Sequence, residues 1–518
     1  MLDLIKDHVP INNLALLENK SEVYDFDCII PDTLPDMLKI LAADAYVETE
    51  IISKASCSAN ITFKINYKIL YLSELDKKIK SFLTTSEHTV KISDPSIKED
   101  DILKVFCRVE NVDARFINSR KISVKTTVCT EVLQKSTLEI GICTGISGAD
   151  DIQLQKKTTE LSSITESVSK CFDIDEEIEL SSGKAAYNEI LRSDTMLSDV
   201  AYSVVGDKLQ IKGNLLMCTF YIADDLNESV QIIENEIPFT HSIEINTIGD
   251  NVIWHAECHL KKYAVETATD LDGEMRILHI SASLSVDADA YSSFPQEYLT
   301  DAYSLSQHFT LNSSLVTSML AVDNISGQFV LKDIAVKSDD LPDIAQIINV
   351  TAALGKYTCS PDSGKVNIDG HVVCNVLYLS EDENSPVASF STKIPFSHSI
   401  ECSECTENLS FFINAYVNHI SFNILSPSET ELRISVVLKG NTIKLCEFSN
   451  ICDITQPDNP FIESDSDKPA ILLYVVQPSD SLWKIAKKYN APLELLKEIN
   501  QLKNPDLIYP GQKILIPG

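Results

Sequence analysis

One stretch of this chain occurs three times, and that repetition limits what the chain can fold into more than any other feature. The third copy reads VNIDGHVVCNVLYLSED and then KIPFSHSIEC, within residues 366–402. The second starts at Leu209 with LQIKGNLLMCTFYIADD and closes with EIPFTHSIEI at Ile245. A more divergent first copy runs from Ile61 to Ile92. The repetition predicts three homologous units in series.

Four landmarks in each copy give the length of the unit. They are Ile40, Ile190 and Ile347; Tyr71, Tyr221 and Tyr378; His88, His241 and His398; and Arg120, Arg276 and Arg433. Each is shifted by 157 residues between copies two and three, and by 150, 150, 153 and 156 residues between copies one and two. Surface loops tolerate such small insertions, and a unit of about 150 residues can bury a core of its own. We therefore expect three domains rather than a solenoid of short repeats.

Composition and charge exclude several classes of protein. The formal net charge is -33, which repels phosphate backbones and anionic lipid, so we expect neither nucleic-acid binding nor binding to a membrane surface. No apolar run reaches the roughly 18 to 20 residues that a membrane span requires, so we expect no membrane insertion. Asp3 and Asp7 stand where an export signal needs basic residues and then an apolar core. Fourteen scattered cysteines favour buried thiols in a reducing cytosol.

Hydrophobic periodicity predicts a mainly β fold. Residues 276–290 alternate apolar and polar side chains, which is typical of a half-buried strand. Proline followed by an apolar cluster around Met37, Ile40 and Leu41 predicts about two turns of helix. We therefore expect three antiparallel sandwich-like or barrel-like domains, each with one short helix.

The same patterns place the domain boundaries. The first domain with its N-terminal extension covers residues 1–150, the second 160–302 and the third 315–453. Residues 454–470 combine prolines with acidic side chains and predict an extended linker, across which the last domain moves relative to the rest. Residues 471–518 form a separate small module.

The small module has the order strand, helix, helix, strand. Asp480 or Ser481 can cap the first helix, whose apolar residues fall on one face, and Pro492 suits the start of the second. The segments DSLWKIAKKY and IYPGQKILIP closely resemble the LysM domain. That resemblance implies a shallow groove for N-acetylglucosamine-containing glycans, or for a protein, between two loops. By position the groove residues are Ser479, Asp480, Ser481, Leu482, Leu507, Ile508, Tyr509 and Pro510.

Two residues of this module qualify the resemblance. The family usually has glycine where this chain has Ser479, which bears on how closely a ligand can approach that loop. Trp483 is interpreted as part of the core.

The three upstream units resemble the SPOCS domain of endospore-forming bacteria. The resemblance is carried by IPF-x-HSI and by an apolar strand ending in Tyr-Leu-Ser-Glu or Tyr-Ile-Ala-Asp; the first copy has Thr-Ser-Glu before His88 instead of Pro-Phe. Three such domains followed by LysM resemble a family of clostridial spore-coat morphogenetic proteins. The resemblance implies a scaffold without catalysis in the mother-cell cytoplasm, at the forespore surface. Its implied partner is a spore-coat morphogenetic ATPase or another coat protein.

Other motifs do not predict catalytic chemistry. The recurring histidines are too few per domain for a metal site, and we expect a structural role, such as a bond to a turn carbonyl. His255, Glu257 and His259 share one strand face, which we expect to be solvated. Cys402 and Cys405 make half of a zinc site. We therefore predict no cofactor and no metal.

Two rival functions remain open. One is a peptidoglycan-binding protein of the envelope, which would require export. The other is an enzyme that uses LysM for targeting, although no repeat carries a credible set of acid, base and nucleophile.

Overall fold

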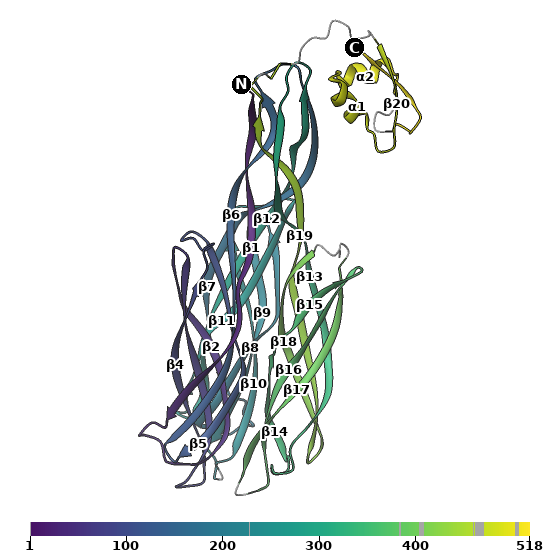
Figure 1. Ribbon diagram of the computed structural model, residues 1–518. Helices are drawn as coiled ribbons and strands as arrows, with labels where there is room; N and C mark the ends of the chain where they lie inside the picture. Colours follow the sequence, from purple (N-terminus) through teal and green to yellow (C-terminus); the bar gives the residue numbers. More distant parts are fainter. Residues whose placement is uncertain are drawn as a thin grey trace.

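The protein is described by a computed structural model that covers residues 2–226, 228–382, 385–402, 409–458, 460–461, 471–502 and 507–517. The described chain is mainly β, and its two helices lie in the C-terminal module (Figure 1). Each of the three repeats is a sandwich of two antiparallel sheets. We name these the outer sheet and the axial sheet.

The two sheets have the same topology in every repeat. In the first repeat the outer sheet has the order β1-β6-β5 and the axial sheet the order β2-β3-β4. The bounds are β1 (Asp3–Ile29), β2 (Met37–Ala55), β3 (Ser58–Ser73), β4 (Ile79–Ser93), β5 (Ile102–Asn118) and β6 (Lys121–Ser147).

The second and third repeats reproduce this order as β7-β12-β11 with β8-β9-β10, and as β13-β19-β18 with β14-β16-β17. In the third, the additional strand β15 also pairs with β16. The bounds are β7 (Ile152–Glu179), β8 (Tyr187–Val205), β9 (Lys208–Ala223), β10 (Val230–Glu244), β11 (Val252–Thr269), β12 (Met275–Ser304), β13 (Thr310–Val336), β14 (Gln346–Leu354), β15 (Thr358–Asp362), β16 (Lys365–Leu379), β17 (Val387–Glu401), β18 (Leu409–Ser426) and β19 (Glu429–Thr455).

The predicted alternation is confirmed on β12. The inward side chains are all buried, from Leu278 through Leu284 to Ala288. Ser285, predicted to point outward, is also buried, because from Leu284 to Ala290 both faces of the strand are largely buried. The strand continues well beyond the predicted residues.

The tyrosine landmarks occupy equivalent places, which shows that the three units share one architecture. All three rings are fully buried. Each hydroxyl donates to a backbone carbonyl 36 residues earlier: Tyr71 to Pro35 at 2.9 Å, Tyr221 to Ala185 at 3.2 Å and Tyr378 to Pro342 at 2.8 Å. The bond ties the middle strand of the axial sheet to the loop that enters that sheet.

The histidine landmarks are also equivalent, and their role is structural. Each ring packs on an aromatic ring of the repeat's first strand: His88 on Tyr24, His241 on Phe172 and His398 on Phe329, with centroids 4.4, 4.2 and 4.3 Å apart. The structural role is as expected, but the suggested hydrogen bond to a turn carbonyl is wrong. A ring on the axial sheet instead joins the two sheets of the sandwich.

The predicted helix around Met37, Ile40 and Leu41 is wrong, because these residues begin strand β2. Register shifts between Met37 and Lys39 and between Ile40 and Ala42 interrupt the two-residue alternation. Ile40 packs against the sandwich core and Leu41 against the neighbouring repeats. A bulged strand with two buried faces therefore produces an apolar spacing that imitates a helix.

The arginine landmark holds in two repeats and fails in the third. Arg120 and Arg276 each donate to carbonyls of the loop between the first two strands, among them those of Ile30 and Leu180. Backbone hydrogen bonds identify the equivalent position in the third repeat as Ser428. Arg433 lies further along β19 and binds Glu431 instead. The turn before β19 is shorter than the turn before β12 in the second repeat, so matching the third repeat to the second by a constant offset selected the wrong residue.

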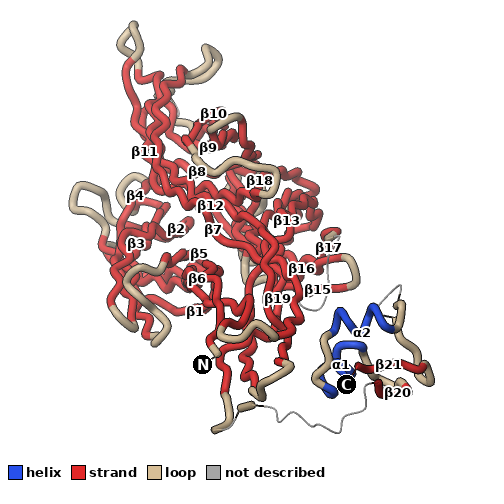
Figure 2. The backbone as a smooth tube through the Cα atoms, turned by 90° about the horizontal axis from the view of Figure 1, so that it is seen from above, coloured by secondary structure: helices blue, strands red, loops and turns tan. Residues whose placement is uncertain are grey.

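The three repeats pack around a common axis. Their axial sheets contribute equivalent apolar residues to one shared cluster: Leu41, Leu191 and Ile348; and Leu70, Phe220 and Leu377. Strand β11 contacts β2, β18 contacts β8 and β5 contacts β14, which closes a ring of three similar interfaces (Figure 2). The body is therefore a pseudo-trimer built from one chain.

Beyond the sandwiches, the first and last strands of each repeat continue as a narrower stalk (Figure 1). Two apolar clusters fill it with residues from all three repeats, including Val9, Leu161 and Val316. Asn12 donates to the carbonyl of Ser162 at 3.5 Å, and the Ser162 hydroxyl donates to that of Met319 at 2.7 Å. The stalk is thus held together by contacts between repeats.

Replacing each landmark tyrosine by phenylalanine tests the equivalence of the repeats. Tyr71→Phe, Tyr221→Phe and Tyr378→Phe each leave a half-buried carbonyl without its hydroxyl donor, and we expect each to lose about 1 kcal/mol of stability. Urea denaturation followed by circular dichroism measures the change. Tyr298→Phe on the stalk serves as a control for the substitution itself. Unchanged denaturation midpoints in all three variants would contradict the role assigned to the hydroxyl.

Candidate functional site

The C-terminal module has the predicted order, with β20 (Ile471–Val475), α1 (Leu482–Tyr489), α2 (Leu493–Ile499) and β21 (Lys513–Pro517). Ser481 is the N-cap of α1, and its hydroxyl accepts the backbone N–H of Lys484 at 3.2 Å. Asn490 ends the helix in the left-handed conformation. The core contains Ile485, Ala486, Leu496, Ile514 and Ile516.

Two backbone hydrogen bonds bring the predicted groove loops together. Val476, which precedes the first loop, accepts the N–H of Gly511 at 2.8 Å and donates to the carbonyl of Gln512 at 2.9 Å. The Gln512 side chain accepts the N–H of Tyr509 at 3.0 Å and shapes the second loop. The loop after β20 and the loop before β21 therefore adjoin, as a groove between them requires.

The structure leaves most of the predicted groove residues accessible. Ser479, Ser481, Leu507, Tyr509 and Pro510 are exposed, Asp480 and Ile508 are half-buried, and Leu482 is buried. Tyr509 is the largest accessible side chain among them, with 64% of its surface exposed. Leu482 packs in the core, so what it can offer a ligand is its backbone. The two loops therefore expose an aromatic ring, aliphatic side chains and hydroxyls on adjoining stretches of the chain.

The backbone conformation at Ser479 explains why the family usually has glycine at this position. Its φ is 69°, in the left-handed region that glycine adopts without strain. Serine keeps the turn and adds a side chain, which projects into solvent. The departure from the family pattern therefore preserves the backbone of the loop.

Asp480 holds the first loop closed. Its carboxylate accepts the N–H of Gln477 and the hydroxyl of Tyr474, each at 2.8 Å. These hydrogen bonds lower the pKa of Asp480 below its ordinary value. Because both bonds are internal, this carboxylate positions the loop.

Trp483 belongs to the core of the module, as predicted, but the acceptor of its indole N–H lies outside the module. It donates to the carboxylate of Asp301, on β12 of the second repeat, at 2.8 Å. Lys487 binds the same carboxylate at 2.5 Å. The sequence contained a usable signal, because a buried indole N–H needs an acceptor. Nothing in the sequence identified that acceptor.

The linker prediction for residues 454–470 is tested only in part. Strand β19 continues to Thr455, so the first residues of this range belong to the body. Residues 459 and 462–470 lie outside the described part of the chain.

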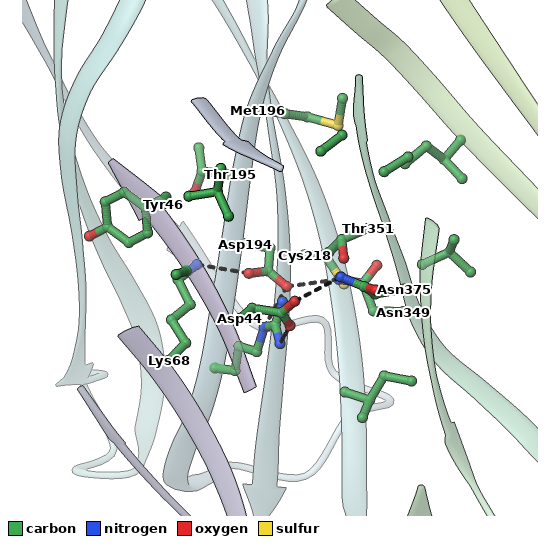
Figure 3. Close-up of a pocket in the computed structure, with 18 of the residues that line it drawn as sticks. Asp44, Tyr46, Lys68, Asp194, Thr195, Met196, Cys218, Asn349, Thr351 and Asn375 are labelled. Atoms are coloured by element: carbon green, nitrogen blue, oxygen red, sulfur yellow. Dashed lines mark hydrogen bonds and ion pairs between the residues drawn. The ribbon is translucent and has the colours of Figure 1, made fainter. Parts of the chain in front are cut away.

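A cavity of about 1170 Å³ lies between the three axial sheets and takes lining residues from every repeat (Figure 3). Arg192 binds both Asp44 and Asp194, and Lys68 donates to Asp194 at 2.8 Å. Asn349 and Asn375, from the third repeat, donate to Asp194 and Asp44 at 2.9 and 3.0 Å. We name these six residues the axial network.

The axial network is built for cohesion between repeats. Burial alone would raise the pKa of Asp194, but Arg192 and Lys68 outweigh it and lower that pKa to about 2. Burial likewise acts against the charge on Lys68, yet Asp194 keeps the Lys68 pKa above its ordinary value. Both shifts favour the charged forms, so the network consists of stable ion pairs and not of groups that titrate near neutral pH.

The expectation of a solvated face for His255, Glu257 and His259 is wrong. The three residues do share one face of β11, but the Glu257 side chain is only 14% exposed and lies 3.2 and 3.7 Å from the two histidines. Burial opposes its charge, and hydrogen bonds from both histidines still hold the pKa of Glu257 well below its ordinary value. Phe106 of the first repeat packs edge to face against His259, whose side chain remains 39% exposed, so the burial is greatest at Glu257.

Metal-like motifs find no support in the described residues. No group of three or more histidine, cysteine, aspartate or glutamate side chains that could hold a metal occurs there. Cys402 is buried, and its sequence partner Cys405 lies outside the described residues. Likewise, none of the helices in the described chain is long and apolar enough to cross a membrane.

The fold defines a class: a sheet-rich repeat protein with a small strand-helix-helix-strand domain as its last module. Comparison with family models makes the class specific. Residues 474–517 match the LysM domain, and residues 188–267 and 343–425 match the SipL, SPOCS domain. These matches confirm the predicted combination, with SPOCS sequence in the second and third repeats. The first repeat shares their topology.

Curated relatives share a short segment about as long as the LysM domain. SpoIVD-associated factor A of Bacillus subtilis and spore coat assembly protein ExsA of Bacillus cereus are each 56% identical over 47 residues, or 9% of this chain. A probable autolysin, SsaALP of Staphylococcus aureus, is 46% identical over 52 residues, or 10% of this chain. The chain spans only 12%, 7% and 19% of the length of these relatives. No solved structure matches. The names of the first two relatives fit a spore-coat protein.

Asp194→Asn tests the axial network. Removing one charge from a buried cluster leaves its partners uncompensated, and we expect a loss of about 3 kcal/mol at neutral pH, measured by urea denaturation. Since the folded-state pKa is lowered, the stabilisation is present above the ordinary value of 3.8 and is lost as pH falls through about 2. The difference between wild type and variant should therefore shrink over that range.

Asp25→Asn is the matched control for this prediction. Asp25 is 65% exposed and lies 3.6 Å from Lys125, so the same substitution there should change stability by less than about 0.5 kcal/mol. Equal losses in the two variants would rule out a special role for the axial network.

Proposed function

We propose that this protein is a non-enzymatic scaffold of the spore coat, which tethers coat components at the forespore surface. The observation that carries the proposal is the joining of SPOCS repeats to a LysM domain whose groove residues remain accessible. The polar clusters between the repeats support it as well. Their charges stabilise the body, and a scaffold needs surfaces rather than a reacting centre.

The LysM domain is the recognition head in this proposal. Its ligand is an N-acetylglucosamine-containing glycan of the cortex or a coat morphogenetic protein, and the SPOCS repeats supply further contacts. A spore-coat morphogenetic ATPase is the protein partner that we propose first. The mother-cell cytoplasm is the proposed compartment, which suits a chain rich in free thiols.

The alternative is a peptidoglycan-binding protein of the envelope. The similarity to a segment of a probable autolysin is the observation that favours it. The two proposals share the glycan groove and differ in compartment, so location discriminates between them.

Binding to purified peptidoglycan tests the groove. Full-length protein should be retained in a sedimentation assay, and Tyr509→Ala should weaken binding about five- to thirtyfold, because stacking of an exposed ring on a sugar is worth roughly 1 to 2 kcal/mol. Leu473→Ala is the control, since this side chain is similarly exposed but lies on β20, outside both loops. If wild type is not retained while a purified coat ATPase captures it through the same tyrosine, the ligand of the groove is a protein.

Location during sporulation tests the compartment. A fluorescent fusion should form a ring around the forespore, and its synthesis should be confined to spore formation. The ring should persist in the Tyr509→Ala variant if the SPOCS repeats suffice for recruitment, and should disperse if the LysM domain is required. Uniform expression in vegetative cells, with signal at the cell wall, would favour the envelope alternative.

A further inference from the structure

The LysM domain is seated on the end of the stalk. Trp483 and Lys487 of α1 share the carboxylate of Asp301, and the Tyr303 hydroxyl donates to the carbonyl of Ala491 at 2.7 Å. The rings of Tyr303 and Trp483 meet edge to face with centroids 5.0 Å apart. Tyr303 is only 5% exposed and belongs to the same apolar cluster as the core of the LysM domain. The contact therefore combines a desolvated aromatic pair with charge-assisted hydrogen bonds.

Only the second repeat can make this contact. Strand pairing places Ser147 and Thr455 at the positions of the first and third repeats that correspond to Tyr303. Gly145 of the first repeat takes the place of Asp301. Three similar stalk ends are available, and one carries both the ring and the carboxylate that the LysM domain contacts.

The path of the chain leads to the same place. After leaving the third repeat, the chain pairs with the segment that follows Tyr303: the carbonyl of Pro460 accepts the N–H of His308 at 2.6 Å, and Phe461 forms a bridge with Gln307. The chain that enters the LysM domain therefore departs from beside the second repeat. This contact is independent of those made by α1.

We propose that residues 301–305 form an intramolecular docking site for the LysM domain, which fixes the direction of its groove relative to the body. The docked face consists of α1 and the start of α2, where Leu493 also donates its N–H to Gln153 at 3.3 Å. The groove loops remain outside the contact, since Tyr509 is 64% and Leu507 56% exposed with the domain docked. Docking therefore presents the groove without covering it.

The two tryptophans of the chain give a direct test, because each indole N–H is a separate signal in a ¹⁵N-tryptophan-labelled full-length protein. Trp254 reports on the body, where its N–H donates to the carbonyl of Thr247 at 3.1 Å. In wild type the two signals should have similar transverse relaxation rates, because a docked domain tumbles with the body. In Asp301→Ala/Tyr303→Ser the Trp483 rate should fall several-fold, and its proton resonance should move upfield with the loss of the carboxylate acceptor.

Asp453→Ala is the matched control, since it occupies the place of Asp301 in the third repeat and is exposed. It should change neither signal. Two results would overturn the proposal: a wild-type Trp483 signal that already relaxes several-fold more slowly than that of Trp254, or a double variant that relaxes like wild type. A dispersed Trp254 signal in its wild-type position confirms that the body remains folded. Because relaxation is read without any ligand, failure of docking is distinguishable from failure of glycan or protein binding.

Discussion

The axial sheets have apolar side chains on both faces, and the rest of the structure depends on burying the second face. One face packs on the outer sheet of its own sandwich, as Tyr71 and its neighbours do. The other presents residues such as Leu41 and Leu70, which pack in one cluster with residues of the second and third repeats. Burial of apolar surface is the main favourable term in folding, so an isolated repeat would leave a large apolar face in water. Three repeats arranged as a ring remove that face from solvent.

Fusion into one chain allows the ring to be asymmetric where a trimer of separate subunits could not be. The position of Asp44 is occupied by Asp194 in the second repeat and by Thr351 in the third. The position of Arg192 is occupied by Ala42 in the first repeat and by Asn349 in the third. One guanidinium can then serve two carboxylates from different repeats. In an exact trimer the same arginine would occur three times, and the cationic groups would repel one another at the axis. Tyr303 shows the same freedom at the stalk.

The sequence predicted what each repeat does alone and missed what the repeats do together. Alternation along β12, the tyrosine and histidine landmarks and the LysM motif are local or recurrent patterns, and they held. The helix expected at Ile40 failed because its spacing reflects two buried faces and a bulge. Glu257 was taken as solvated because burial by another repeat leaves no mark on the periodicity of its own strand. The groove residues were predicted from the LysM resemblance alone and stay a prediction. The axial cavity, whose lining comes from three distant stretches, had no signal in any one of them.

The long outer strands separate two ends of the molecule, and this separation is compatible with the scaffold function proposed above. A 27-residue strand such as β1 can extend to at most about 90 Å, at roughly 3.3 Å per residue. Paired in each repeat with a strand of 27 to 30 residues and packed as three ribbons, such strands resist bending in a way that a flexible string of domains would not. The LysM domain lies at the stalk end, and the loops entering the axial sheets lie at the other (Figure 1). In the proposed function, these two ends would contact different coat components, separated by the length of the paired strands.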